Sequence, residues 1–301
     1  MSFSSEVKEE LCQIPLEHSA CIQAEAYGVL LFCNSFGSSG IRISTQSPGF
    51  SARLPALFQA AFGIPFDEQP KHYDSGHKQI FRVTNRSAIQ RILETFGYSV
   101  ESIVSHHINY AVLEEHESIV AFCRGAFLAG GSVTDPSKRY HLEMATNHLY
   151  VHREFQALLP ELHLTPRSTQ RKANYLTYLK QNDAIAGFLT AIGAPRGAKQ
   201  VVNARLEKKL VNGVNRQYNC DVANVEKAVA AAQTQIEAIR RLRELGDLEH
   251  LPEKLQETAR VREAHPELSL AELAEICHPP VSKSCLNHRL RKLQDLATGK
   301  E

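Results

Sequence analysis

Tyr-Gly-Val-Leu-Leu-Phe-Cys-Asn-Ser at residues 27–35 is matched, 97 residues later, by Arg-Gly-Ala-Phe-Leu-Ala-Gly-Gly-Ser at residues 124–132. The same offset recurs downstream, where Phe58-Gln59-Ala60 matches Phe155-Gln156-Ala157. An offset of 96 then relates the segments that end at Gly97 and Gly193. A self-similarity that persists over three segments predicts one structural unit built twice. The identical positions in the first pair are Gly28 and Gly125, Leu31 and Leu128, and Ser35 and Ser132.

Each repeat has the pattern of helix, two strands, helix, two strands, helix (αββαββα). We therefore expect an α+β domain at residues 1–210, with repeats at about 20–100 and 118–195, followed by an all-α domain at 211–301. Four segments alternate in the period-two manner of half-buried strands, namely 41–45, 78–83, 140–145 and 173–180. Four others have helical spacing, namely 53–62, 87–97, 152–159 and 183–193.

The two matching stretches resemble the LAGLIDADG homing endonucleases, in which two such helices pack against each other through small residues. Glycine suits this contact because it has no Cβ atom and lets two backbones approach closely. The resemblance implies that the second acid of each motif binds the divalent metal that cleaves DNA. Those positions are Cys33 and Gly130 here, with Asn34 and Gly131 beside them, and none of the four is an acid. We therefore predict a nuclease-like scaffold without catalytic residues, metal or cofactor.

Two details of the motifs leave alternatives open. Asp135 lies just beyond the second motif, although the same offset leads to Ser38 in the first repeat. Gly130 and Gly131 also suit a helix C-cap, where glycine adopts the left-handed conformation at low cost. An active LAGLIDADG-type DNA endonuclease is the enzymatic alternative.

The net charge of +1 conceals an uneven distribution. From Arg167 to Arg216 there are ten Lys and Arg residues against Asp183 and Glu207, a local balance of +8, so the rest of the chain carries about −7. A solvated charged face explains short runs of this kind, but so long a segment with so few acids favours a polyanion, above all nucleic acid. The candidates for contacts with the DNA backbone are Arg171, Lys172, Lys180, Arg205, Lys208 and Lys209.

The second domain is expected to begin with a long helix near Val211. Asn219 or Asp221 is available as its N-cap, and Gly246 suits its end. An apolar stripe at three-four spacing runs along this helix. We expect the stripe to pack against the helices that follow, and a seam that binds a partner is the alternative. The stripe consists of Val222, Val225, Val229, Ala232, Ile236 and Ile239.

Three helical segments close the chain. Residues 252–264 form the first, a capping box at Ser269 starts the second, and Pro279-Pro280 forces a turn before the third. The third is polar and basic on its outer face, and its inner stripe is Leu286, Leu290 and Leu293. This pattern predicts a helix-turn-helix at about 268–298. Its candidate DNA-binding residues, on the recognition helix, are Ser282, Lys283, Ser284, Asn287, His288, Arg289, Arg291 and Lys292.

The two halves together resemble one family over nearly the whole chain: the WhiA-type bacterial regulators, which join a degenerate LAGLIDADG domain to a C-terminal helix-turn-helix. The most specific segments are 124–133, 215–224, 279–284 and 287–293. The resemblance implies transcriptional control linked to cell division, chromosome segregation or sporulation. We therefore expect a non-catalytic, sequence-specific transcription regulator that binds double-stranded DNA. A scaffold whose nuclease-like domain binds a regulatory protein is the alternative.

The cysteines and the N-terminus indicate the compartment. Seven cysteines occur without a Cys-x-x-Cys pair, which favours reduced thiols in a cytoplasm. No secretory signal is visible, and no segment is long and apolar enough to span a bilayer. We expect a cytoplasmic, nucleoid-associated protein with no membrane partner. His148 and His152 have the spacing of a metal pair but no third ligand nearby in sequence, and Cys277 is expected in a helical core.

Overall fold

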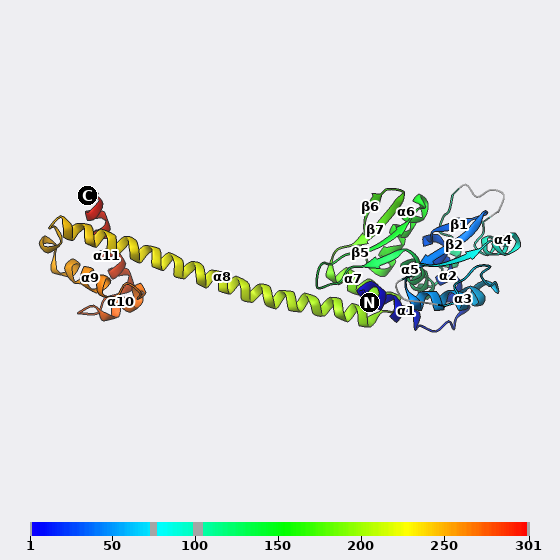
Figure 1. Cartoon of the computed structure of the whole chain (residues 1–301), viewed down its shortest axis with the longest axis horizontal. Coiled ribbons are helices and arrows are strands. Elements are labelled where there is room, and N and C mark those ends of the chain that lie inside the picture. The colour runs from blue at the N-terminus through cyan, green and yellow to red at the C-terminus, as the bar shows by residue number, and fades with distance from the viewer. Residues whose placement is uncertain (1, 73–76, 99–104, 300–301) are drawn as a thin grey trace. The chain divides into compact units, whose positions relative to one another are not determined.

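The computed structural model describes residues 2–72, 77–98 and 105–299, and it divides into two units (Figure 1). The first unit comprises Met1–Lys208 and the second Lys209–Glu301. The domain boundary proposed between residues 210 and 211 falls inside one helix, α8 (Pro195–Glu244), which both units share. The expected end of the first repeat near residue 100 and the last two residues of the chain lie outside the described residues.

The first repeat forms a small antiparallel sheet covered by helices. Its strands pair in the order β1-β2-β3, with Ile41 opposite Val83 and Ile43 opposite Phe81. These four side chains are buried on one face of the sheet, as the alternating pattern of the two segments predicted. The elements are α2 (Ser19–Phe32), β1 (Ser35–Gly37), β2 (Gly40–Thr45), α3 (Pro48–Phe62), β3 (Gln79–Val83) and α4 (Arg86–Thr95).

The second repeat has the complete expected order, with strands paired as β4-β5-β7-β6. Its first helix runs directly into β4, where Gly131 has a φ of −90°. The expected left-handed C-cap is therefore wrong, because the chain continues as an extended strand. The elements are α5 (His116–Gly130), β4 (Gly131–Val133), β5 (Leu142–Thr146), α6 (Leu149–Leu158), β6 (Arg167–Arg171), β7 (Asn174–Leu179) and α7 (Asn182–Ile192).

The first repeat differs from the second in one strand. Within the described residues, an isolated bridge between Glu68 and Arg82 stands where the second repeat has β6. Pro65 and Pro70 lie in this segment, and proline cannot donate a hydrogen bond to a strand ladder. The expected four strands per repeat are thus present in the second repeat, whereas the described part of the first repeat has three.

The helices α2 and α5 touch at the backbone, as the two motif glycines predict. A Cβ atom at Gly28 would meet the carbonyl oxygen of Phe122, and one at Gly125 would meet that of Glu25. Glu25 and Phe122 are themselves 97 residues apart, so the contact is symmetric. Both helices also contact both sheets, α2 at β1 and β5, and α5 at β2 and β5. The duplicated motif therefore forms the axis of the first unit.

A buried carboxylate joins the motif helices to their neighbours. Glu25 is 1 % exposed and accepts hydrogen bonds from Arg53 on α3 at 2.6 and 3.0 Å. It also accepts one from Arg124 on α5 at 3.1 Å, and Arg124 in turn donates to the carbonyl oxygen of Ile192 at 2.9 Å. A charge at this depth needs such partners, because an unpaired buried carboxylate is strongly destabilising.

The N-terminal helix α1 (Phe3–Cys12) ties distant segments of the first unit together. The carboxylate of Glu9 accepts a hydrogen bond from the backbone N–H of Gly49 at 2.7 Å, at the start of α3. The carboxylate of Glu10 accepts one from the N–H of Gly197 at 3.0 Å, at the start of α8. Each acid thus lies at a helix N-terminus, where negative charge is stabilising.

The long helix α8 begins earlier than expected. It starts at Pro195, a first-turn position that suits proline, and continues to Glu244. Asn219 and Asp221 lie inside it, so the expected N-cap at either residue is wrong: no proline follows Pro195 that would interrupt the helix. Gly246, with a φ of 78°, follows its end as expected. Neither α8 nor any other helix in the described part of the chain is apolar over a length that would cross a membrane.

The second unit has its own helical core. The predicted inner stripe of Leu286, Leu290 and Leu293 is buried there, with Cys277 beside it. The expected capping box is present at Ser269. Besides the C-terminal part of α8, the core is built from α9 (Glu253–Ala264), α10 (Leu270–Ile276) and α11 (Lys283–Thr298).

The apolar stripe of α8 is covered over only part of its length. Ile239 is fully buried in the core of the second unit, and Ala232 is 7 % exposed. Val222, Val225 and Val229 are exposed. The expectation that the stripe packs against the following helices is therefore wrong for its first half, because the core of the second unit reaches only the C-terminal part of α8.

Candidate nucleic-acid interface

Helix α11 presents the predicted recognition residues on the side away from the core. Ser282 caps the helix, since its hydroxyl accepts a hydrogen bond from the backbone N–H of Cys285 at 3.2 Å. Ser284, His288 and Arg291 are exposed, and Asn287 is half-buried. All four were expected on the outer face from the helical wheel, and the structure leaves that face open.

The cations of α11 are free of acidic partners among the described residues. The ion pairs of the second unit join Arg243 to Glu263 and His265 to Glu267 instead. The first turn of α11 contains no acid. Asparagine and arginine can form bidentate hydrogen bonds with base edges in the major groove, and lysine and serine commonly bind phosphate. The four cations are Lys283, Arg289, Arg291 and Lys292.

A buried arginine fixes the position of the two short helices. Arg262 on α9 is 3 % exposed and donates to the carbonyl oxygens of His265 at 3.0 Å and Pro266 at 2.6 Å, in the loop before α10. On the other side of α10, the carboxylate of Glu257 accepts from the N–H of His278 at 2.6 Å. Arg262 was not among the residues predicted from the sequence. The sequence feature that could have revealed it is its position three residues after Ala259, on the side of α9 that faces the core.

The C-terminal ends of α2 and α5, where the resemblance places the metal-binding acids, carry Cys33 and Gly130. Cys33 follows α2, and its thiol donates to the carbonyl oxygens of Leu30 and Ser35 at 3.1 and 3.2 Å. Burial raises the pKa of Cys33 to about 12, so the thiol remains neutral. At Gly130 a Cβ atom would lie 2.5 Å from the backbone oxygen of Ala145, which leaves no room for an acid.

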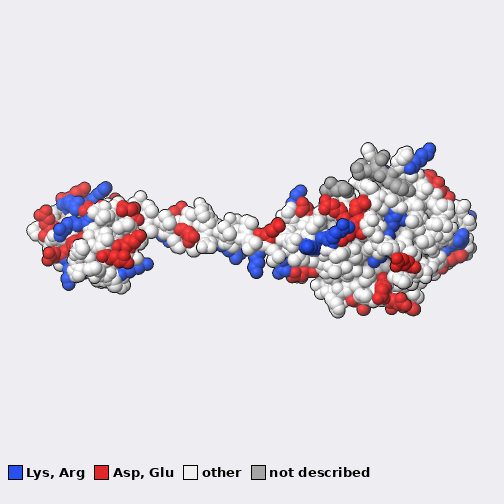
Figure 2. All heavy atoms as spheres, turned by 90° about the horizontal axis from the view of Figure 1, so that it is seen from below, with Lys and Arg blue, Asp and Glu red and all other residues white. Residues whose placement is uncertain are grey.

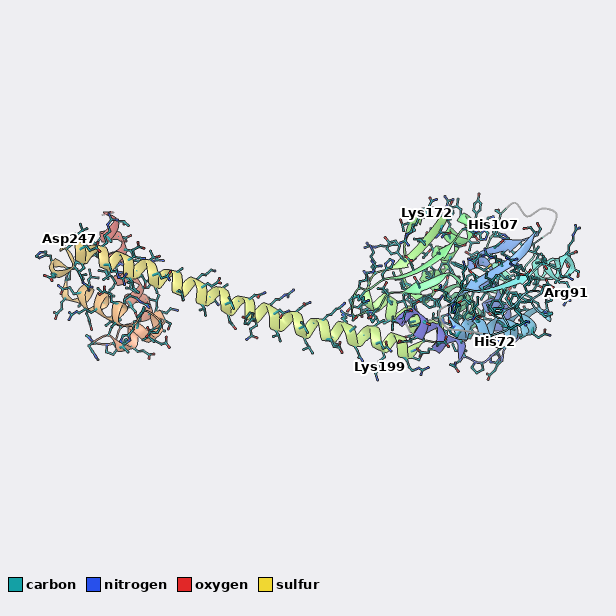
Figure 3. The ribbon with its side chains drawn as sticks, in the orientation of Figure 1. His72, Arg91, His107, Lys172, Lys199 and Asp247 are labelled. Atoms are coloured by element: carbon teal, nitrogen blue, oxygen red, sulfur yellow. The ribbon has the colours of Figure 1, made fainter. Side chains whose placement is uncertain are left out.

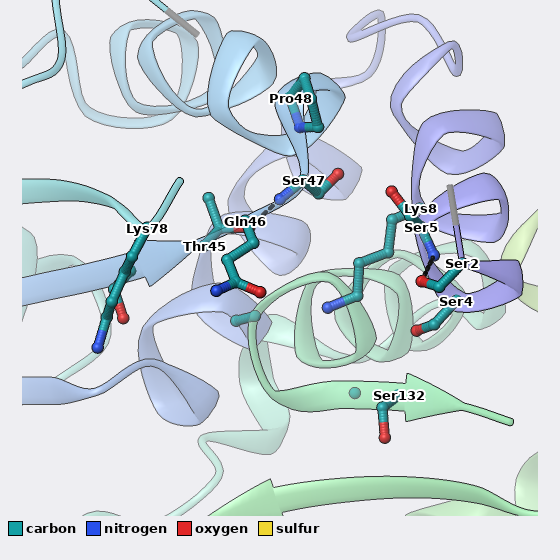
Figure 4. A pocket seen from close by; sticks show the side chains of 13 residues that line it. Ser2, Ser4, Ser5, Lys8, Thr45, Gln46, Ser47, Pro48, Lys78 and Ser132 are labelled. Atoms are coloured by element: carbon teal, nitrogen blue, oxygen red, sulfur yellow. Dashed lines mark hydrogen bonds between the residues drawn. The ribbon is translucent and has the colours of Figure 1, made fainter. Parts of the chain in front are cut away.

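A hollow of about 700 Å³ opens beside the foot of α5 (Figure 4). The ammonium of Lys8 on α1 donates to the carbonyl oxygen of Leu128 at 3.0 Å, near the negative end of the α5 dipole. Burial lowers the pKa of Lys8 to about 8, which leaves it mostly charged at pH 7. Lys78 is a second cation, and the rest of the lining is uncharged and rich in serine. The hollow therefore suits an anion such as phosphate rather than a divalent cation.

Three of the six predicted backbone contacts already have partners in the first unit. Arg171 lies 3.5 Å from Glu143, and Arg205 forms an ion pair with Asp183. Lys208 donates to the carbonyl oxygen of Pro136 at 2.8 Å, and its ammonium lies 4.6 Å from the ring centroid of Tyr140. The partners of Arg171 and Lys208 could not be found within the basic segment, because Glu143, Pro136 and Tyr140 lie outside it. Asp183, the partner of Arg205, lies within it.

The other three predicted backbone contacts are exposed. Lys172 lies at the tip of the β6–β7 hairpin, with a φ of 55°, and projects outward (Figure 3). Lys180 follows β7 with its ammonium 5.1 Å from the ring centroid of Tyr178, and Lys209 lies on α8. On the face of the first unit that Figure 2 shows, basic and acidic side chains are interspersed. Lys172, Lys180 and Lys209 are thus the exposed cations among the six candidates that have no acidic partner within the described residues.

The two histidines weighed as metal ligands have other contacts. Nδ1 of His152 lies 3.0 Å from the hydroxyl of Thr177, and its ring stacks on Tyr175. The ring of His148 meets the edge of His106. Within the residues that the structure describes, no group of three or more His, Cys, Asp or Glu side chains gathers as a metal site. All seven cysteines are free thiols, and Cys277 is buried as expected.

Family models match both units of the chain. A model described as the WhiA C-terminal HTH domain matches residues 214–297, which include α9, α10 and α11. A model described as the WhiA LAGLIDADG-like domain matches residues 119–210, from the first turn of α5 into α8. The helix-turn-helix predicted from the sequence is thereby supported by an independent comparison.

Full-length relatives match as well. A "Probable cell division protein WhiA" from Ruminiclostridium cellulolyticum is 35 % identical, over 99 % of this chain and 97 % of its own length. A protein of the same name from Clostridium perfringens is 34 % identical, over 99 % and 98 %. The crystal structure of full-length DUF199/WhiA from Thermotoga maritima matches with a TM-score of 0.60 and 27 % identity, over 99 % of both chains.

Proposed function

The chain belongs to the WhiA family, and from this premise we propose that it is a non-catalytic, sequence-specific DNA-binding transcription regulator of cell division. The relatives named above are called probable cell division proteins, and this name supports a role in cell division. Links to chromosome segregation or sporulation, and a place at the nucleoid in the cytoplasm, are part of the same proposal.

The outer face of α11 is the observation that carries the proposal. Its polar and basic side chains project from a helix whose opposite side is locked into a core. Arg262 and the capping box at Ser269 hold the preceding loop and helix in place. A recognition helix must be rigid if its side chains are to distinguish base edges. We therefore assign base recognition to Ser284, Asn287, His288 and Arg291.

We assign sequence-independent phosphate contacts to the first unit. Lys172 and Lys180 are exposed at opposite ends of β7, and Lys8 and Lys78 make the hollow beside the C-terminal end of α5 cationic. Contacts of this kind add affinity that falls with salt and carry little sequence information.

The residues at the C-terminal ends of α2 and α5 support the absence of nuclease activity. Metal-assisted cleavage needs a bound divalent metal, and these positions carry a neutral buried thiol at Cys33 and a crowded glycine at Gly130 in place of acids. Supercoiled plasmid incubated with the pure protein and Mg²⁺ or Mn²⁺ should stay intact. Cleavage that disappears in Asp135→Ala would contradict the proposal and would place a metal site at that residue.

The scaffold alternative assigns DNA binding to the second unit alone. The ion pairs of Arg171 and Arg205 favour it, because those cations are already neutralised. It predicts that replacing Lys172, Lys180 and Lys78 together by alanine leaves the salt dependence of DNA binding unchanged. The DNA-contact proposal predicts a flatter dependence, by roughly 0.9 in the slope of log K against log salt for each phosphate that the protein no longer neutralises.

Chromatin immunoprecipitation with sequencing tests the proposed regulator directly. The wild-type chain should enrich a defined set of sites that share a motif. A chain carrying Arg291→Ala, expressed at the same level, should enrich those sites more weakly while remaining folded, because one base contact is lost. Equal enrichment by both chains would contradict base recognition by Arg291 on α11. No enrichment by the wild-type chain would contradict the proposed function.

A further inference from the structure

The part of α8 that the core of the second unit does not cover carries a row of exposed apolar side chains. Each is between 37 and 68 % exposed, and Tyr218 is among the most exposed. Single exposed apolar residues are ordinary on a protein surface, but a continuous row of them marks an interaction site. The row consists of Val211, Val214, Tyr218, Val222, Val225 and Val229.

Apart from Val214, which lies beside the seam, the row has the spacing of a coiled coil. Val211, Tyr218 and Val225 are seven residues apart, and the series continues to Ala232 and Ile239 in the core. A second heptad series, displaced by four residues, contains Asn215, Val222, Val229 and Ile236. Two apolar positions per heptad, alternately three and four residues apart, form the seam along which two helices wind around each other.

We propose that α8 pairs in parallel and in register with α8 of a second copy of this chain, along the seam from Val211 to Val229. The proposal concerns self-association and does not depend on DNA binding. Val222 and Val229 would occupy the a positions of the heptad, where β-branched side chains favour two-stranded coils.

Two features of the seam favour a second copy over a different partner. Asn215 occupies an a position, and in a parallel pair in register it faces Asn215 of the other copy, where the two amides can exchange a hydrogen bond. The positions that flank the seam are mostly uncharged, which a symmetric pair requires because it places like residues near like. Figure 2 shows this part of α8 largely white. The uncharged flanking residues between Val211 and Val229 are Asn212, Val214, Asn219 and Ala228, and the charged ones are Asp221 and Glu226.

The length of the seam limits the area that the two helices bury and therefore the affinity of the dimer. From Val211 to Val229 the helix rises about 27 Å. A helix pair this short buries less than the roughly 1,600 Å² of a standard interface. We therefore expect a weak dimer, in the micromolar range, that two adjacent DNA half-sites would strengthen by holding both chains together.

One charged pair distinguishes the proposed arrangement from an antiparallel one. In the parallel pair, Asp221 of one copy faces Glu226 of the other, five residues further along, and this contact is repulsive. The substitution Glu226→Lys converts it into an attractive pair. We expect the dimer to tighten about two- to fivefold as a result.

Sedimentation over a wide protein concentration range tests self-association. The substitutions Val222→Glu and Val225→Glu place two charges in the seam and should weaken the dimer about a hundredfold. Ala230→Glu and Ala231→Glu add the same charge on the opposite face of α8, where both alanines are exposed, and should leave the dimer unchanged. All four positions are exposed or nearly so, which keeps each variant folded.

Disulfide formation tests the register. In a chain whose exposed Cys220 and Cys285 are replaced by serine, Val222→Cys should form a covalent dimer under a mild thiol oxidant. Ala231→Cys in the same background should remain monomeric. A wild-type chain that stays monomeric at its highest soluble concentration, and that gives no Val222→Cys dimer, would overturn the proposal. A dimer that tolerates the seam glutamates would overturn it as well.

Discussion

The cations of the basic segment from Arg167 to Arg216 and the cations of α11 look alike in the sequence, but their surroundings differ. Arg171 and Arg205 face acids, and Lys208 is held by a carbonyl oxygen and a ring. Arg291 and Lys292 lie on a helix face without a paired acid among the described residues. A cation that is already paired has less to gain from a phosphate or a base. This difference supports the proposal that α11 recognises bases and that the first unit has a weaker supporting role.

The largest effect is expected from a substitution that destabilises the first unit and leaves the second unit unchanged. Glu25→Ala leaves Arg53 and Arg124 buried without their carboxylate, and we expect the first unit to lose about 3–5 kcal/mol of stability. Chemical denaturation should show the transition of the first unit move while that of the second stays. Glu68→Ala, which breaks the exposed pair with Arg82, is the matched control and should have little effect. A Glu25→Ala chain as stable as wild type would show that the ion pairs of Glu25 with Arg53 and Arg124 do not stabilise the first unit.

The recognition face can be tested one residue at a time. Asn287→Ala should cost about 1–3 kcal/mol of binding free energy on the cognate site, because the alanine cannot form a bidentate hydrogen bond with a base. Binding to scrambled DNA should hardly change. Fluorescence anisotropy at fixed salt measures both. Equal weakening on the two DNAs would mean that Asn287 binds phosphate or supports the fold instead of reading a base.

The exposed cations Lys172 and Lys209 should have a smaller effect on DNA affinity, which is seen in how the affinity depends on salt concentration. Replacing Lys172 and Lys209 by alanine should flatten the slope of log K against log salt by about one to two units, on cognate and random DNA alike. Lys208→Ala should change the slope less, since its ammonium already binds the carbonyl oxygen of Pro136. A slope that falls as much for Lys208→Ala as for the exposed pair would show that Lys208 leaves this site to contact DNA.

The smallest expected effect is a pH dependence confined to the first unit. Burial and the neighbouring His106 lower the pKa of His148 to about 4, below its ordinary value of 6.5. The unfolded chain therefore binds a proton between these values that the folded chain does not, and stability falls as pH drops from 6.5 towards 4. The loss of stability between pH 7 and pH 5 should shrink in His148→Gln. An unchanged pH profile in this variant would assign the dependence to other groups, among them His106 and His152.

The sequence predicted much of the fold because its signals were local or repeated. The 97-residue offset placed α2 and α5 as a pair, and the glycines in that offset are the points of backbone contact. The capping box at Ser269 and the stripe of Leu286, Leu290 and Leu293 located the helices of the second unit. Each of these patterns depends on residues within a few turns of one another or on a similar second copy.

The rest depended on contacts between segments with no shared pattern. Lys8 reaches Leu128 across 120 residues, and α1 lies outside both repeats, so the cationic hollow had no sequence signal. The pairing of Arg171 with Glu143 likewise joins different strands. The exposed seam of α8 was recognised as a stripe, but its spacing alone does not tell which part the second unit covers.

In vitro selection from random double-stranded DNA is the most direct measurement of the division of labour between the two units. We predict that the wild-type chain selects a defined motif, and that Arg291→Ala selects the same motif with one base position relaxed. Substitution of Lys172 and Lys209 should leave the motif intact and lower only the yield of bound DNA. A motif that survives Arg291→Ala and Asn287→Ala unchanged, yet degrades when cations of the first unit are removed, would contradict the account.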